Sequence, residues 1–299
     1  MSTNQPAIAV PTSVAPNLPP AGNPLSKFFR QPAIYISLPS GGEFWPEGAL
    51  EMPENEELPV YPLTSKDEIM LRTPDALMNG QAVVDVIHSC LPNVKNAWAM
   101  PSIDIDTALI ALRIASYGHA MDFTHTCTKC NEEHTYSMDL RHLMSTIKMP
   151  DFETPAEFQG LRIQFRPNNY REITLINQTS YEINRQTQAI DANQIEGEGR
   201  ATYIASTMQR VIDMGNDALV NSTISIEDLS SGTVTTDREF IKEFFNNIDR
   251  KLFTSIQESL IERSKDANIK PQEATCQSCG EPITLNILFD YANFFVVGS

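Results

Sequence analysis

The sequence contains no run of about 18 apolar residues, the length that a helix needs to cross a membrane, so no membrane span is predicted. Its N-terminus has no basic start followed by an apolar stretch, which argues against a secretory signal peptide. Cysteines of a protein that is not exported stay reduced. We therefore expect the chain to be made and to fold in a cytoplasm.

Basic residues are scarce. The chain has 22 Lys and Arg against 38 Asp and Glu, which gives a formal net charge of −16. Non-specific nucleic-acid binding depends on neutralising phosphates, so this charge argues against it. The stretch from Glu43 to Glu57 carries six glutamates and no basic residue, and we expect it to be a solvated acidic loop.

Motifs that carry chemistry are also missing. The sequence has no phosphate-binding loop, no dinucleotide fingerprint and no nucleophile elbow. Gly197 and Gly199 lie close together, but Glu196 and Glu198 beside them would repel a phosphate. The sequence therefore predicts a protein without enzymatic activity.

Cysteine is rare, yet four of the five cysteines form two Cys-x-x-Cys pairs far apart in the chain, Cys127/Cys130 and Cys276/Cys279. Two thiolates at this spacing can hold one side of a tetrahedral Zn²⁺, and a second pair completes the shell. We predict that all four cysteines bind one Zn²⁺. A shell of four thiolates leaves no position for water or substrate, so the site would be structural.

Other interpretations of these cysteines remain. The pairs could be redox dithiols, although no thioredoxin-like strand and helix surround them. They could also be disulfides or unbound thiols. His125 and His134 flank the first pair and could replace a ligand. Cys90 lies in an apolar run and is predicted to be a buried, small hydrophobic residue.

The first part of the chain divides into two segments. Residues 1–26 form a Pro-rich arm without charged side chains, which is either a disordered tail or an extended segment that becomes ordered against a partner. Residues 27–66 combine a short strand at 32–38, the turn Pro39-Ser40-Gly41-Gly42 and the acidic loop.

Residues 67–150 and 271–299 are predicted to form a zinc-clamped core. Thr64-Ser65 with Glu68 predicts a first helix start, and Thr73-Pro74 begins a second helix that stops at Pro92. Asp104 or Asp106 is expected to cap a third. After each cysteine pair, apolar residues alternate as in a hairpin strand: His134, Tyr136, Met138 and Leu140, then Ile283, Leu285, Ile287 and Phe289.

Residues 151–270 are predicted to be a mostly helical insertion. After a short strand pair near 161–165, helices are expected at 167–192, 201–219, 237–247 and 249–264. The last two share a Phe-rich stripe that suits a core or a partner's groove. The predicted fold class is α+β, mainly helical with short strands and a zinc-ribbon-like element that joins 127–130 to 276–279.

Several segments resemble the T4-type bacteriophage baseplate protein family, which includes baseplate hub subunits and assembly proteins of contractile tails. The similar segments are Arg72-Thr73-Pro74-Asp75-Ala76-Leu77-Met78-Asn79-Gly80 with Asp85-Val86-Ile87-His88-Ser89-Cys90, Leu38-Pro39-Ser40-Gly41-Gly42, Asp104-Ile105-Asp106, Leu112-Arg113-Ile114-Ala115, and the nearby Cys127-x-x-Cys130.

The resemblance implies a structural component of a phage tail baseplate, at or near the hub. It implies other baseplate or hub proteins as partners, location in the virion, and assembly in the host cytoplasm. The N-terminal arm would dock on a neighbouring subunit. One alternative is a transient assembly factor that is absent from the mature virion, and another is a zinc-ribbon regulator that binds nucleic acid.

Overall fold

The computed structural model describes residues 23–73, 78–192, 198–285 and 294–295. The chain divides into two compact units, residues 1–31 and 32–299. The described part of the first unit holds one 3-10 turn, η1 (Ser26–Phe28), in which the Lys27 ammonium lies 5.0 Å from the centre of the Phe28 ring. Most of the predicted arm, residues 1–22, lies outside the described residues.

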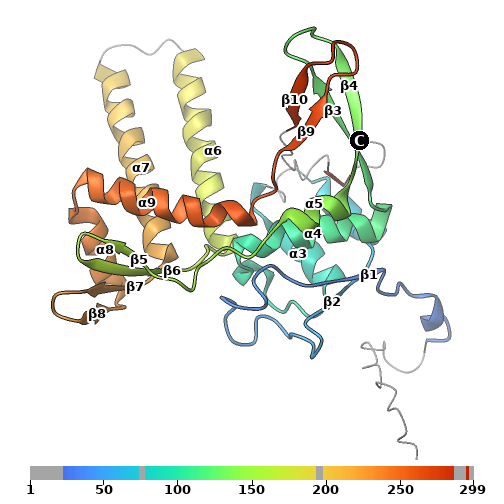
Figure 1. The fold of residues 1–299 in the computed structure, drawn as a ribbon, viewed down its shortest axis with the longest axis horizontal. Coiled ribbons are helices and arrows are strands. Elements are labelled where there is room, and N and C mark those ends of the chain that lie inside the picture. Colours follow the sequence, from blue (N-terminus) through green and yellow to red (C-terminus); the bar gives the residue numbers. More distant parts are fainter. Residues whose placement is uncertain (1–22, 74–77, 193–197, 286–293, 296–299) are drawn as a thin grey trace, which may run out of the picture. The chain divides into compact units, whose positions relative to one another are not determined.

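The second unit begins with a two-stranded antiparallel sheet and a helical core (Figure 1). The elements are β1 (Ile34–Ile36), β2 (Leu58–Val60), α1 (Ser65–Leu71), α3 (Gln81–Cys90), η2 (Ala97–Ala99), α4 (Ser102–Tyr117) and α5 (Leu140–Thr146). Helix α4 buries residues on nearly all of its faces, which places it at the centre of this core. The final described residues, Phe294 and Phe295, belong to the same core.

The helices of this core begin only partly where the sequence predicts. Thr64 caps α1 as predicted, but its capping-box partner is Asp67, the third residue of the helix, whereas Glu68 accepts a hydrogen bond from the Tyr117 hydroxyl. The prediction that Asp104 or Asp106 caps the third helix is wrong, because α4 already begins at Ser102.

The second predicted helix is α3, which begins after Gly80. The φ of Gly80 is 77°, a left-handed backbone conformation that favours glycine. Its predicted start at Pro74 lies outside the described residues. The helix ends at Cys90, two residues before Pro92, as the sequence predicts.

Buried Asp104 attaches the segment after β1 to α4. Its carboxylate accepts hydrogen bonds from the Ser40 N–H at 2.8 Å, the Ser40 hydroxyl at 2.6 Å and the Trp45 indole N–H at 2.9 Å. Burial raises the pKa of Asp104 to about 6, although these three hydrogen bonds act in the opposite direction. The turn at 39–42 is therefore held by a residue more than sixty positions later.

Residues 151–270 contain a second core, in which the four predicted helices are present beside a sheet that is larger than the predicted strand pair. An antiparallel sheet has the order β5 (Ala156–Phe158), β6 (Leu161–Phe165), β7 (Thr223–Asp228) and β8 (Thr233–Thr235). The β7–β8 hairpin was missed, although Ile224 and Ile226 alternate with polar residues before the turn at Gly232.

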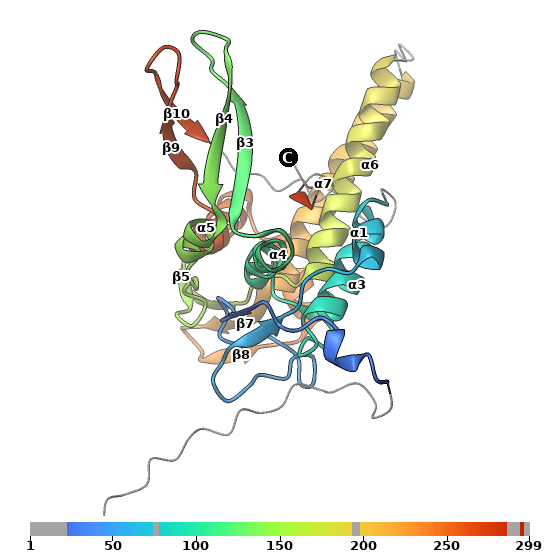
Figure 2. The same ribbon diagram turned by 90° about the vertical axis from the view of Figure 1, so that its right-hand side faces the viewer.

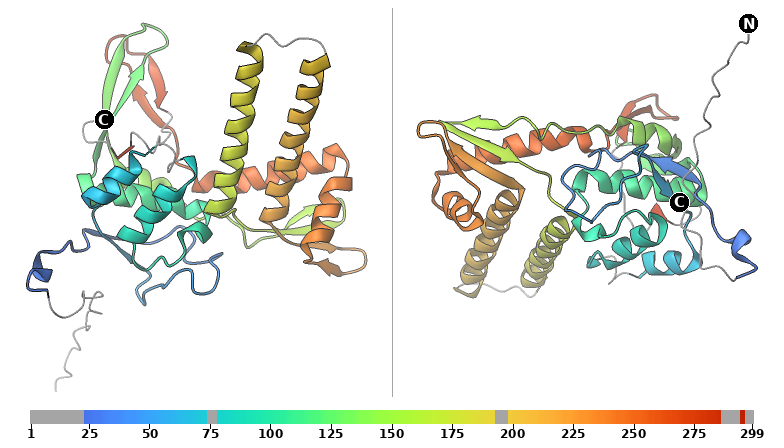
Figure 3. Two further views of the ribbon diagram at one scale, coloured as in Figure 1. Left: turned by 180° about the vertical axis from the view of Figure 1, so that it is seen from behind. Right: turned by 90° about the horizontal axis from the view of Figure 1, so that it is seen from below.

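Helices α8 (Arg238–Asn247) and α9 (Arg250–Ser264) complete this second core, and η3 (Lys265–Ala267) follows (Figure 3). Asp237 and Asp249, the first residues of the two predicted ranges, cap these helices. The core interpretation of the Phe-rich stripe is confirmed for Phe245 and Ile256, which are buried, whereas Phe240 is 63% exposed.

Two long helices, α6 (Tyr170–Ala192) and α7 (Glu198–Ser222), lie side by side and project away from α9 (Figures 1 and 2). Tyr203 bridges them through hydrogen bonds of its hydroxyl with Thr187 and the Ile183 carbonyl. No helix in the described ranges combines the length and apolar character needed to span a membrane.

The remaining strands form two antiparallel hairpins that Figure 2 shows side by side. They are β3 (Ala120–Thr126) with β4 (Glu133–Asp139), and β9 (Gln272–Thr275) with β10 (Pro282–Leu285). The predicted continuation of the last strand through Ile287 and Phe289 lies outside the described residues. Helices with short antiparallel strands confirm the α+β class.

We expect the substitution Asp104→Ala to lower the free energy of unfolding by about 3 kcal/mol, since it leaves three donors of Ser40 and Trp45 without a buried acceptor. Urea denaturation measures this change. Asp122→Ala, at an exposed position of β3, is the matched control and should change stability by less than about 0.5 kcal/mol. Equal effects of the two substitutions would contradict the proposed role of Asp104.

Candidate metal centre

Each Cys-x-x-Cys pair occupies the turn of one β-hairpin. Cys127 and Cys130 follow β3, and Cys276 and Cys279 follow β9. In the first turn, the Cys127 N–H donates to the Glu132 carbonyl at 2.9 Å and its carbonyl accepts from the Asn131 N–H at 2.9 Å. The same two bonds close the second turn. The two halves of the site are therefore built alike.

The residue that follows each pair has a left-handed backbone. Asn131 has a φ of 58° and Gly280 a φ of 70°. Asparagine and glycine are the residues that tolerate this conformation best, so the local sequence itself permits both turns.

The four sulfur atoms converge at one point. The Cys127 and Cys279 sulfurs are 3.8 Å apart, those of Cys130 and Cys276 are 3.6 Å apart, and all four lie within 4.8 Å of one another. A tetrahedral ion with Zn–S bonds of about 2.3 Å would place its sulfur ligands about 3.8 Å apart. The arrangement therefore fits a four-coordinate metal ion.

The protonation of the thiols also favours a cation. Backbone N–H groups of Cys130 and Lys129 donate to the Cys127 sulfur and lower the pKa of that thiol to about 7. The Glu132 N–H acts likewise on Cys130, but burial and the neighbouring thiols outweigh it and raise the pKa of Cys130 to about 12. Thiolates this close repel one another, so a bound cation is needed to release all four protons.

Contacts around the sulfurs join the two hairpins. The Lys129 ammonium pairs with the Glu281 carboxylate, and the Tyr136 hydroxyl donates to the Thr275 carbonyl at 3.3 Å. Ile283 and Leu285 are buried beside the cysteines. The Lys129–Glu281 pair was missed from the sequence, because opposite charges in two distant turns indicate proximity only once the turns are known to meet.

The other residues considered from the sequence lie outside the cluster. His125 and His134 face each other across β3 and β4, and within the described ranges the cluster consists of cysteines alone. The His134 Nε2 atom is buried and finds no hydrogen-bond partner among the residues that the structure describes. Cys90 is fully buried in the first core, as predicted, with its sulfur 3.9 Å from the Pro62 carbonyl oxygen.

Comparison with known proteins agrees with the resemblance seen in the sequence. Residues 38–296 match the family model described as T4 bacteriophage base plate protein. Neither the search of curated proteins nor the search of solved structures found a match. Since the family match covers both cores and both cysteine pairs, the chain belongs to the T4 bacteriophage base plate protein family.

Proposed function

We propose that the protein is a structural subunit of a contractile-tail baseplate, at or near the hub, and that it binds other baseplate or hub proteins. The family match over residues 38–296 carries this proposal. We also propose that the protein acts without catalysis, because its sequence has no recognisable catalytic motif and four thiolates around a bound ion would leave no place for a substrate.

Exposed apolar residues support a role in assembly. Ile204, Met208, Val211 and Ile212 of α7 are between 44% and 63% exposed. Exposed apolar side chains that gather on one segment are characteristic of surfaces that contact other proteins. The acidic chain suits protein partners better than nucleic acid.

The cysteine site is proposed to hold one structural Zn²⁺ through Cys127, Cys130, Cys276 and Cys279. When bound, the ion supplies the positive charge that keeps all four sulfurs deprotonated. The two hairpins bury few apolar side chains of their own, so metal binding would add directly to the stability of the fold.

Removal of the metal tests the zinc proposal. Elemental analysis should find one zinc ion per purified chain, and Cys276→Ser should abolish it and lower the thermal midpoint by about 5–10 °C. Cys90→Ala is the control: it removes a buried thiol far from the site and should leave one zinc per chain. A chelator that leaves the midpoint unchanged would contradict a structural ion.

Counting the protein in particles tests the structural role. Quantitative mass spectrometry of gradient-purified phage should find a fixed, low copy number relative to the tail-tube subunit. Absence from particles whose tails cannot form without the protein would instead indicate a transient assembly factor. Absence with normal tails would refute both roles.

Deletion of residues 1–26 tests the proposed docking of the arm. We expect the shortened chain to keep its zinc and its thermal midpoint but to enter tails at least tenfold less often, because an arm that becomes ordered on a neighbour contributes contact area without supporting the core. Normal incorporation of the shortened chain would show that the arm has no docking role.

A further inference from the structure

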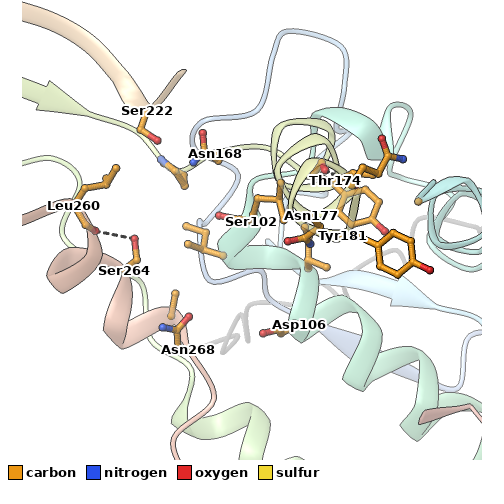
Figure 4. Close-up of a pocket in the computed structure, with 18 of the residues that line it drawn as sticks. Ser102, Asp106, Asn168, Thr174, Asn177, Tyr181, Ser222, Leu260, Ser264 and Asn268 are labelled. Atoms are coloured by element: carbon orange, nitrogen blue, oxygen red, sulfur yellow. Dashed lines mark hydrogen bonds between the residues drawn. The ribbon is translucent and has the colours of Figure 1, made fainter. Parts of the chain in front are cut away.

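A cavity of about 650 Å³ lies where the two cores meet, between α4, the first turns of α6 and the end of α9 (Figure 4). Ile103 of the second core and Tyr170 of the first both line it. This volume falls within the range of sites that bind small molecules or short peptide segments.

Three polar groups in the wall of the cavity have no partner. Ser222 is 1% exposed, and within the described part of the chain neither its hydroxyl nor the buried Asn168 side-chain carbonyl oxygen has a hydrogen-bond partner. Among the described residues, no group donates a hydrogen bond or an ion pair to the Asp106 carboxylate. Buried polar groups are normally satisfied, so two unsatisfied buried groups and the half-buried, unpaired Asp106 carboxylate around one cavity indicate a binding site.

Backbone contacts show how these groups come to line one cavity. The Ser102 N–H donates to the Asn168 carbonyl at 2.8 Å, and Asp106 follows Ser102 by one turn on the same face of α4. The Arg166 N–H donates to the Ser222 carbonyl at 2.8 Å, which places Ser222 beside the strand that leads to Asn168. Figure 4 shows all three side chains at the cavity.

The residues that line the cavity indicate which kind of ligand it would bind. Among the described residues, no Lys, Arg or His lines the cavity, and two of the three unpartnered groups can only accept hydrogen bonds. Burial raises the pKa of Asp106 to about 6, so the carboxylate is charged and unpaired at pH 8. Ile105, Ile173 and Leu260 supply apolar wall between the polar groups. A cation on an apolar stem matches both kinds of surface.

We propose that this cavity binds a lysine- or arginine-bearing segment of a neighbouring subunit, with Asp106 as the counter-ion and the Asn168 carbonyl and Ser222 hydroxyl as acceptors for further donors of the segment. The subunit partner rests on the proposed function, whereas recognition of the cation rests on the cavity alone.

Capped amino acids test recognition of the cation. N-acetyl-arginine methylamide and N-acetyl-lysine methylamide, titrated into the full chain at pH 8, should shift the amide NMR signals of residues 102–106, 168 and 222. The citrulline analogue, which has the shape of arginine without its charge, should bind at least tenfold more weakly. Equal binding of arginine and citrulline, or no binding of either cation, overturns the proposal.

Substitutions connect the binding to the named groups. Asp106→Asn should weaken binding of the arginine probe at least tenfold, and Ser222→Ala should weaken it severalfold. Asp122→Asn, which removes an exposed carboxylate of β3, is the matched control and should leave it unchanged.

The thermal midpoint separates this role from a structural one. Asp106→Asn should keep or raise the midpoint at pH 8, because it removes an unpaired, half-buried charge. A lower midpoint would show that Asp106 already has a partner within the fold, which contradicts the proposal.

A photo-crosslinking residue in place of Tyr181, which lines the cavity, tests the source of the cation. In assembled tails it should capture a Lys- or Arg-containing segment of a neighbouring subunit. Free cadaverine that binds as tightly as the lysine probe, without a crosslinked protein, would overturn the peptide ligand. If the probes bind but the protein is absent from particles, the proposed function fails and recognition of the cation stands.

Discussion

The convergence of four cysteine sulfurs is the constraint on which the C-terminal part of this structure depends. Two-stranded hairpins are at best marginally stable in water, and these two hairpins share only a few buried apolar side chains. Their turns meet where the four sulfurs lie within 4.8 Å of one another. Phe294 and Phe295 then pack in the first core. The last hairpin is thus attached at both of its ends.

Two aspartates of helix α4 have different roles because their surroundings differ. Asp104 and Asp106 are two positions apart, and burial raises the pKa of each to about 6. Asp104 faces Ser40 and Trp45, which satisfy it with three hydrogen bonds, so it stabilises the fold. Asp106 faces the cavity instead. A half-buried carboxylate without donors is only partly hydrated and costs stability, and that cost is explained if a partner provides the donors.

The architecture suits a protein that contacts several neighbours. Two separate cores carry projections of different kinds, namely the cysteine-linked hairpins and the α6–α7 pair. The α7 helix leaves four apolar side chains exposed, whereas the cavity offers buried acceptors. Exposed apolar surface and buried hydrogen-bond acceptors favour different partners. A partner that covers the apolar surface gains stability from the buried area, whereas a partner in the cavity gains stability by donating hydrogen bonds to the acceptors.

The sequence predicted local structure correctly wherever residues close together in the chain determine that structure. Asp237 and Asp249 cap helices because each carboxylate reaches N–H groups two or three residues ahead. The Cys-x-x-Cys turns are equally local, and a tetrahedral metal site needs four ligands, so the pairing of Cys127/Cys130 with Cys276/Cys279 was also predictable.

Tertiary structure alone decided the rest. Asp104 could have capped a helix, but contacts with residues sixty positions away made it a buried acceptor. The β7 strand forms against β6 across the whole α6–α7 pair, and its short alternating run gave little indication of that pairing. Asp106, Asn168 and Ser222 share a cavity only because three separate segments meet there. Sequence patterns report nearest neighbours along the chain, whereas burial and unsatisfied hydrogen bonds depend on which distant segments the packed cores bring together.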